Sequence, residues 1–168
     1  RDGSNEPLQQ INIKGLIDES IVYCDKKILE ANIAIQVVGL EAEPEDFSIE
    51  GRETELLQVL CNLISNACDA VEGRPQPHIV IKVSRHVGEL ELSITDNGSG
   101  ISKDNLNKIM TPFFTTKVVG KGTGLGLSIA RGIVRSHKGR LYVDTQSAKT
   151  CFVVRLPMSQ NIKTIKSA

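Results

Sequence analysis

The sequence has no charge surplus, no long apolar run and no paired cysteine motif, and each absence removes a class of function. Twenty basic and twenty acidic residues give a formal net charge of zero at pH 7. Basic surfaces that bind nucleic acid or membranes carry a surplus that is missing here. No apolar run approaches the length of a membrane span, and no signal-like segment opens the chain. We therefore expect a cytoplasmic protein with no nucleic-acid partner.

The cysteines follow neither a redox nor a zinc pattern. No two of them form a C-x-x-C pair, and no histidine follows one of them at zinc spacing. We expect reduced, mostly buried thiols. The four are Cys24, Cys61, Cys68 and Cys151.

Strand and helix patterns interleave along the 168 residues, which are enough for one domain with its own core. Apolar residues at helical spacing predict helices over 16–31, 52–72 and 123–137, with a short helix over 103–109 after Ser102. Alternating runs predict strands at 11–14, 33–38, 78–85, 89–96, 141–144 and 151–156. Because several strands are adjacent in sequence, this order favours a mixed or antiparallel sheet with helices on one face.

The helix predicted over 52–72 carries polar residues beside its core face. Its apolar side chains share an arc about 100° wide: Leu56, Leu60, Leu63, Ile64, Ala67 and Val71. A second arc, roughly 80° wide, holds Glu55, Gln58, Asn62, Asn66 and Asp69, with no lysine or arginine. Carboxamide oxygens suit Mg²⁺ that is bound together with phosphates and water. Local hydrogen bonds by the asparagines are the alternative, and the helix alone leaves both open.

A first glycine cluster, Asp96-Asn97-Gly98-Ser99-Gly100-Ile101, follows a predicted strand. A buried carboxylate at Asp96 can accept a hydrogen bond from an exocyclic amine such as adenine N6. Gly98 and Gly100 allow the backbone to approach a flat base without a clash at Cβ. An ordinary hairpin turn is the alternative.

A second cluster, Gly122-Thr123-Gly124-Leu125-Gly126-Leu127, opens a predicted helix. Free N–H groups at such a helix start form a phosphate cradle, and Lys117 and Lys121 can add charge. The pattern is neither a Walker loop nor a Rossmann fingerprint. A flexible loop is the alternative. Two aromatic residues, Phe113 and Phe114, lie in the polar segment between the clusters. Because exposed aromatic side chains are costly, we expect them to pack against the rest of the domain or to contact a partner.

Four segments together resemble the catalytic, ATP-binding domain of bacterial-type sensor histidine kinases. The wider group also holds gyrase, a heat-shock chaperone and a mismatch-repair ATPase. The resemblance covers about residues 10–157, and two of its motifs look closest to kinases of the nitrogen-regulation type. The segments are Asn62-x-x-x-Asn66-Ala67-x-Asp69-Ala70 (the asparagine box), Asp96-x-Gly98-x-Gly100 (a glycine box), Pro112-Phe113-Phe114-Thr115-Thr116-Lys117 (the phenylalanine box) and Gly122-Thr123-Gly124-Leu125-Gly126-Leu127 (a second glycine box).

The resemblance implies an α/β two-layer sandwich, in which three helices cover one face of a mixed, mostly antiparallel sheet, and it implies ATP and Mg²⁺ as cofactors. Asn66 would coordinate Mg²⁺, with Asn62 beside it and Asp69 on the same side. Asp96 would bind the adenine amine. Gly98, Gly100 and Ile101 would line the base, and Thr150 would contact adenine through water. Gly124, Leu125 and Gly126 would present N–H groups to the phosphates, with Lys117 near the phosphate tail. The other nucleotide-binding residues implied are Gly122, Thr123 and Leu127. Residues 101–122 would form a lid over the nucleotide.

The resemblance also implies domain boundaries and partners. Residues 11–157 would be the ATP-binding domain, 1–10 a residual linker and 158–168 a disordered tail. None of His78, His86 and His137 stands in the context of a phosphoacceptor. The γ-phosphoryl group would therefore pass to a histidine on a separate dimerisation domain of a homodimeric parent, with a response regulator downstream. We expect the fragment to bind ATP without phosphorylating itself.

One segment departs from the family's pattern, and three alternative functions stay open. The family's Gly-x-Gly-Thr segment is replaced by Ser147-Ala148-Lys149-Thr150, which keeps only the threonine. An ATP-driven clamp usually has a glutamate where Asn62 stands, and asparagine cannot act as that general base. An anti-sigma-type serine kinase usually lacks the Phe-Phe-Thr-Thr-Lys segment. A scaffold with a vestigial pocket is the third alternative.

Overall fold

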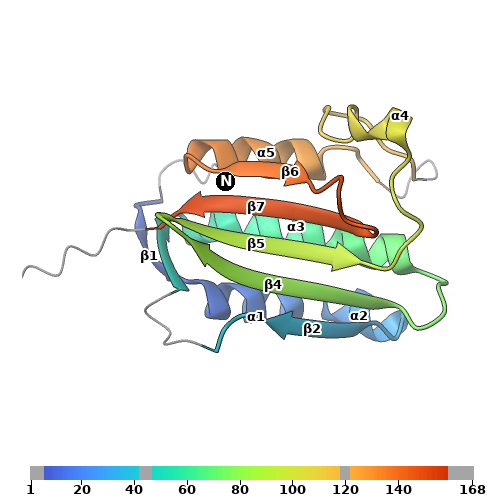
Figure 1. Cartoon of the computed structure of the whole chain (residues 1–168), viewed down its shortest axis with the longest axis horizontal. Coiled ribbons are helices and arrows are strands. Elements are labelled where there is room, and N and C mark those ends of the chain that lie inside the picture. The colour runs from blue at the N-terminus through green and yellow to red at the C-terminus, as the bar shows by residue number, and fades with distance from the viewer. Residues whose placement is uncertain (1–5, 42–46, 118–121, 159–168) are drawn as a thin grey trace, which may run out of the picture.

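The computed structural model describes residues 6–41, 47–117 and 122–158. Its main sheet has five strands in the order β2-β4-β5-β7-β6, of which only β2 and β4 pair in parallel (Figure 1). The strands are β2 (Ala34–Val38), β4 (His78–His86), β5 (Glu89–Asp96), β6 (Arg140–Val143) and β7 (Thr150–Pro157). A second sheet pairs β1 (Gln9–Asn12) with β3 (Ser48–Gly51).

Helices cover one face of the main sheet, as predicted. α3 (Glu53–Val71) packs between α1 (Ile13–Tyr23) and α5 (Gly126–Ser136), and all three lie behind the sheet in Figure 1. Two shorter helices, α2 (Asp25–Glu30) and α4 (Lys103–Leu106), complete the described set. The mixed, mostly antiparallel sheet covered on one face by three helices is therefore confirmed.

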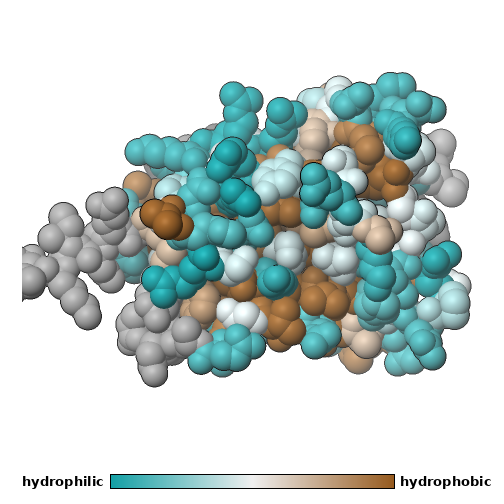
Figure 2. Space-filling view, viewed as in Figure 1, coloured by the Kyte–Doolittle hydropathy of each residue, from teal (hydrophilic) through white to brown (hydrophobic). Residues whose placement is uncertain are grey.

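The core lies between the sheet and α3. Alternate residues of β5 point to the helices, and their register partners on β7 do the same, as in the pairs Leu92–Val154 and Ile94–Phe152. All six apolar residues predicted for the core face of α3 are buried. Val59 and Cys68 are buried as well, because helices pack on both sides of α3. No helix of the described residues lies over the opposite face of the sheet, and Figure 2 shows hydrophilic side chains over much of that face.

The N-terminal elements differ from the prediction. The strand predicted at 11–14 lies at 9–12, because Asn12 caps α1 by accepting a hydrogen bond from the N–H of Gly15 at 3.1 Å. The helix predicted over 16–31 breaks at Cys24, which separates α1 from α2. Strand β3 was not predicted; it is only four residues long and pairs with β1 alone among the strands.

Two later helices are shorter than predicted. The helix expected over 123–137 begins at Gly126, because Gly124 has φ +69° and cannot continue a helical turn. The helix expected over 103–109 ends at Leu106, and Ser102 is its N-cap residue without a side-chain capping bond. The first difference lies just after the segment predicted as a lid (101–122), and the second lies within it.

The cysteines are free, as predicted, and three of the four are buried. Burial raises the pKa of the Cys61 and Cys68 thiols to about 11, so little thiolate forms at neutral pH. No helix within the described ranges combines the length and apolar character that crossing a bilayer requires.

His137 joins the end of α5 to the start of α3. Its Nε2 accepts a hydrogen bond from the backbone N–H of Arg52 at 3.0 Å, so its Nδ1, 2.9 Å from the carbonyl of Ile133, is assigned as the protonated nitrogen. The side chain is 2% exposed. The sequence indicated only a histidine near a helix C-terminus, whereas the fold uses it as a buried connection between two helices.

Replacing His137 with alanine is expected to lower the free energy of unfolding by about 2–3 kcal/mol, through two lost hydrogen bonds and a cavity. Denaturant unfolding measures the difference, with exposed Arg135→Ala as the control expected to change stability by under about 0.5 kcal/mol. Equal effects from the two substitutions would contradict the assigned role.

Candidate functional site

The polar stripe of α3 faces the second glycine cluster. Asn62, Asn66 and Asp69 are all partly buried. The Nδ2 of Asn62 donates to the carbonyl oxygen of Gly126 at 3.1 Å, across 64 residues of sequence. A Cβ built on Gly126 would lie 3.5 Å from the Asn62 side chain, so the two segments are in van der Waals contact. The stripe therefore lines the boundary between α3 and the start of α5.

Oxygen atoms of Asn66 and Asp69 converge on a cation. The Nζ of Lys117 lies 3.1 Å from Asn66 Oδ1 and 2.5 Å from Asp69 Oδ2. Lys27 on α2 donates to the other Asp69 oxygen at 2.7 Å. Partial burial alone would raise the pKa of Asp69, but the two lysines outweigh it and hold that pKa below its usual range. The donor set fits a positive charge, which is the chemistry that a magnesium site needs.

Asp96 is the buried carboxylate at the end of β5, with 2% of its surface exposed. Burial raises the pKa of Asp96, and a hydrogen bond from the Gly98 N–H to Oδ1 at 2.8 Å partly opposes the rise. Within the described residues, only Oδ1 accepts such a bond. Oδ2 therefore stays available to a donor outside the chain.

Gly98 lies directly against the end of α3. A Cβ at this position would be 2.5 Å from the carbonyl oxygen of Ala70 and 2.7 Å from Asp96 Oδ1. Gly100 has open space around it but needs φ +83°, which favours glycine. Gly98 thus separates the Asp96 carboxylate from the C-terminal end of α3, the helix that carries Asn62 and Asn66.

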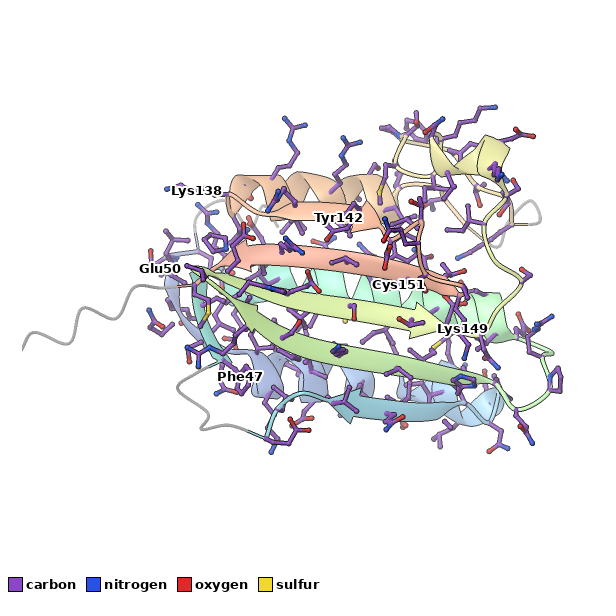
Figure 3. All side chains as sticks on the ribbon, viewed as in Figure 1. Phe47, Glu50, Lys138, Tyr142, Lys149 and Cys151 are labelled. Atoms are coloured by element: carbon purple, nitrogen blue, oxygen red, sulfur yellow. The ribbon has the colours of Figure 1, made fainter. Side chains whose placement is uncertain are left out.

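Thr150 lies opposite Asp96 in the β5–β7 register. The preceding turn is built without glycine, since Asp144 Oδ1 accepts from the Gln146 N–H at 2.9 Å and Ser147 Oγ accepts from the Lys149 N–H at 3.2 Å. Figure 3 shows Lys149 and Cys151 at this end of β7. The altered segment therefore still places its threonine beside the buried carboxylate.

The second glycine cluster contacts the phenylalanine box. A Cβ on Gly124 would lie 2.5 Å from the backbone carbon of Phe113 and 2.8 Å from the oxygen of Phe114. Thr123 Oγ1 accepts from the Leu125 N–H at 3.4 Å, just before α5. Among the described residues, no side chain caps α5, so the N–H groups of its first turn, from Gly126 onward, have no side-chain acceptor there.

The remaining predicted residues lie around α3 and the two glycine clusters. Ile101 and Leu127 are partly buried against the core, and a Cβ on Gly122 would lie 3.0 Å from the Lys117 side chain. Phe113 is 77% exposed, whereas Phe114 is partly buried. Lys121 and the rest of 118–121 lie outside the described residues, as do 1–5 of the predicted linker and 159–168 of the predicted tail.

Sequence reasoning missed two residues beside the site. The sequence patterns did not indicate Lys27 as a residue of the site. Asn97 looked like a turn residue, yet its Oδ1 accepts from the His78 N–H at 2.9 Å and its Nδ2 donates to the Gln76 carbonyl at 3.0 Å. No local pattern could reveal either pairing, since the partners lie 19 to 42 residues away in sequence.

Residues 51–160 match the family model of the histidine kinase-, DNA gyrase B- and HSP90-like ATPases. The match takes in every motif described above. This chain belongs to that family. The predicted resemblance to a histidine kinase catalytic domain is confirmed, because the relatives described below are sensor kinases.

The chain is 42% identical over 127 residues to the two-component sensor PprA of Pseudomonas aeruginosa, a match that covers 73% of this chain and 14% of that one. It is 36% identical to the sensor histidine kinase ZraS of Escherichia coli K12, over 90% of this chain and 31% of ZraS. Against the sensory histidine kinase/phosphatase NtrB of Rhizobium leguminosarum, identity is 29% over 90% of this chain and 42% of NtrB. This member of the family thus spans less than half the length of these relatives.

A solved structure of the ThkA histidine kinase catalytic domain, in a nucleotide-free form, superposes on the chain with a TM-score of 0.75. Sequence identity is 31%, and the match covers 89% of this chain and 95% of the ThkA domain. The resemblance in fold thus extends over nearly the whole of a histidine kinase catalytic domain.

Proposed function

We propose that this histidine kinase domain binds magnesium–ATP and presents its γ-phosphoryl group to a histidine on a separate helical domain. The observation that carries the proposal is the convergence of Asn66 and Asp69 oxygens on the Lys117 ammonium, at the edge of the family's ATP motifs. The amide oxygen of Asn66, which accepts a hydrogen bond from this ammonium group, suits Mg²⁺. The bound Mg²⁺ would neutralise phosphate charge.

In this proposal each end of the site binds one end of the nucleotide. Asp96 accepts a hydrogen bond from the adenine amine through Oδ2, with Thr150 beside it, while Gly98, Gly100 and Ile101 lie along the base. The N–H groups at the start of α5, from Gly124 to Leu127, bind the phosphates. Lys117 moves from the α3 oxygens to the phosphate tail. These residues orient the nucleotide and stabilise charge, which is the main contribution a protein makes to phosphoryl transfer.

The Asn62 contact favours phosphotransfer over an ATP-driven clamp. Asn62 donates its amide N–H to the Gly126 carbonyl. A glutamate acting as general base has no proton to donate there, and the asparagine cannot take one from water. Water activation at this position is therefore disfavoured, whereas positioning of the second glycine cluster is favoured.

The proposed partners follow from the positions of the histidines, none of which suits a phosphate acceptor. His137 is buried between helices, and neither His78 nor His86 lies in a helix. We infer that the accepting histidine belongs to a dimerisation domain of a homodimeric parent. Histidine kinase ThkA, solved in complex with the response regulator TrrA, matches 90% of this chain at 27% identity and a TM-score of 0.75. A response regulator is accordingly our proposed downstream partner.

Replacing Asn66 with alanine is expected to remove the strengthening effect of Mg²⁺ on ATP binding. Calorimetry on the unaltered chain should give an ATP affinity at least about tenfold higher with Mg²⁺ than without it, and the variant should lose most of that ratio. Asn107→Ala, at an exposed asparagine of the predicted lid, is the control and should keep the ratio of ATP affinities with and without Mg²⁺.

Absence of ATP and ADP binding by the unaltered chain would overturn the proposed function. Transfer is checked by adding the histidine-bearing domain of a relative in trans and assaying for acid-labile phosphohistidine. Stable binding with release of free phosphate in place of phosphohistidine would favour the clamp.

A further inference from the structure

The Asp69 carboxylate accepts hydrogen bonds from two lysine side chains that come from different parts of the chain. Lys27 on α2 donates to Oδ1 at 2.7 Å, and Lys117 of the lid donates to Oδ2 at 2.5 Å. One carboxylate and two lysines leave a net positive charge at this point. Neither lysine is interchangeable with the other, because their surroundings differ.

Lys27 bonds to two side chains of one helix, α3. It also donates to Ser65 Oγ at 2.7 Å, and Ser65 and Asp69 lie one turn apart on α3, against which α2 packs. Within the described residues, the Lys117 ammonium group bonds only to Asn66 and Asp69 of α3. Its backbone N–H instead donates to Thr115 Oγ1, inside the segment between the two glycine clusters. Lys117 can therefore leave Asp69 by a rearrangement of the lid, and Lys27 stays.

We propose that Lys27 is a positioning residue for nucleotide binding, which keeps Asp69 neutralised when Lys117 transfers to the nucleotide phosphates. The inference rests on the proposed function. An unpaired carboxylate beside the phosphate end would repel the triphosphate, and at separations below 10 Å in a partly buried site such repulsion is large enough to change affinity by about tenfold. Paired with Lys27, Asp69 presents no net charge to the phosphates.

The first test replaces Lys27 with glutamine and measures Mg-ATP binding by calorimetry. Affinity should fall about tenfold, whereas adenosine, which has no phosphate, should bind as to the unaltered chain. The matched control is Lys26→Gln, on the same helix, whose side chain is 85% exposed and lies 3.9 Å from Glu30. The control should bind Mg-ATP as the unaltered chain does.

A second replacement separates neutralisation from direct contact. Adding Asp69→Asn to Lys27→Gln should restore Mg-ATP affinity to within about twofold of Asp69→Asn alone, because no carboxylate is left to neutralise. Adding it to Lys117→Gln should not restore affinity, because Lys117 acts on the phosphates themselves. If Lys27 contacted the phosphates directly, Asp69→Asn would rescue neither variant, and the inference would be wrong.

The outcomes separate this inference from the proposed function. Binding by the unaltered chain with equal affinities for Lys27→Gln and Lys26→Gln overturns the inference alone. An equal loss of adenosine and ATP binding in Lys27→Gln also overturns it, since that pattern indicates a general structural defect. Absence of nucleotide binding in the unaltered chain overturns both.

Discussion

Replacing Asp96 with asparagine is expected to weaken ATP binding about 10- to 100-fold while leaving the nucleotide-free fold at least as stable. The amide oxygen can keep the hydrogen bond from the Gly98 N–H that Oδ1 accepts now. The other atom then becomes an NH₂ group, so the site presents a donor to the adenine amine, which is also a donor. Calorimetry measures the loss.

Base preference gives this prediction a second readout. Guanine carries an acceptor oxygen where adenine carries the amine, so the variant should lose ATP affinity much more than GTP affinity. An unchanged ratio of ATP to GTP affinity would place the base elsewhere in the domain. Ser99→Ala, in the same loop, is the control and should keep the ratio of the unaltered chain.

Stability should change with pH in a direction fixed by burial. Burial raises the pKa of Asp96 above its unfolded value, so the folded chain binds its proton more tightly than the unfolded chain does. Ionisation therefore lowers stability as the pH rises through the range above about 4, where an ordinary aspartate already carries its charge. Asparagine has no such cost, so the stability of Asp96→Asn relative to the unaltered chain should increase as the pH rises through that range.

Replacing Gly98 with alanine is expected to lower the free energy of unfolding by about 2–3 kcal/mol, a loss typical of overpacking. The added Cβ would meet the Ala70 carbonyl at 2.5 Å, and this backbone oxygen lies on α3, which cannot shift without disturbing the core. Nucleotide binding should fall as well, because Asp96 Oδ1 lies 2.7 Å from the same Cβ. Denaturant unfolding and calorimetry measure the two effects.

Gly132 provides the matched control. It lies exposed within α5, with no atom within 4 Å of a built Cβ, so alanine there should raise stability by about 0.5–1 kcal/mol. Opposite signs for the two substitutions would confirm that contact, and not the loss of a glycine as such, decides the effect. A neutral Gly98→Ala would show that the loop after β5 and α3 are less closely packed at this point.

Periodicity was sufficient to predict the elements that form the core. The six apolar residues assigned to the core face of α3 are all buried, and the paired strands on either side of residues 86–88 lie where alternation placed them. These segments are long, and their apolar pattern matches one period throughout. The four sequence boxes likewise contain most of the residues that the fold brings together.

Features that depend on distant partners could not be read from the sequence. Strand β3 is too short to show alternation and forms because β1 pairs with it. The break at Cys24 carries no glycine or proline as a signal. Lys27 meets Asp69 only because that break sets the direction of α2 against α3. Each of these is fixed by packing between elements and has no local sequence signal.

The small β1–β3 sheet links both ends of the described chain to the start of α3. Met158 forms an isolated bridge with Ile49 of β3, so the beginning and the end of the described chain meet on the same strand. β3 ends at Gly51, and α3 begins two residues later at Glu53. A rotation or pull applied at β1 or at Met158 would therefore reach α3 through β3. A displacement of the start of this helix, which is about 28 Å long, would also displace Asn66 and Asp69 near its other end.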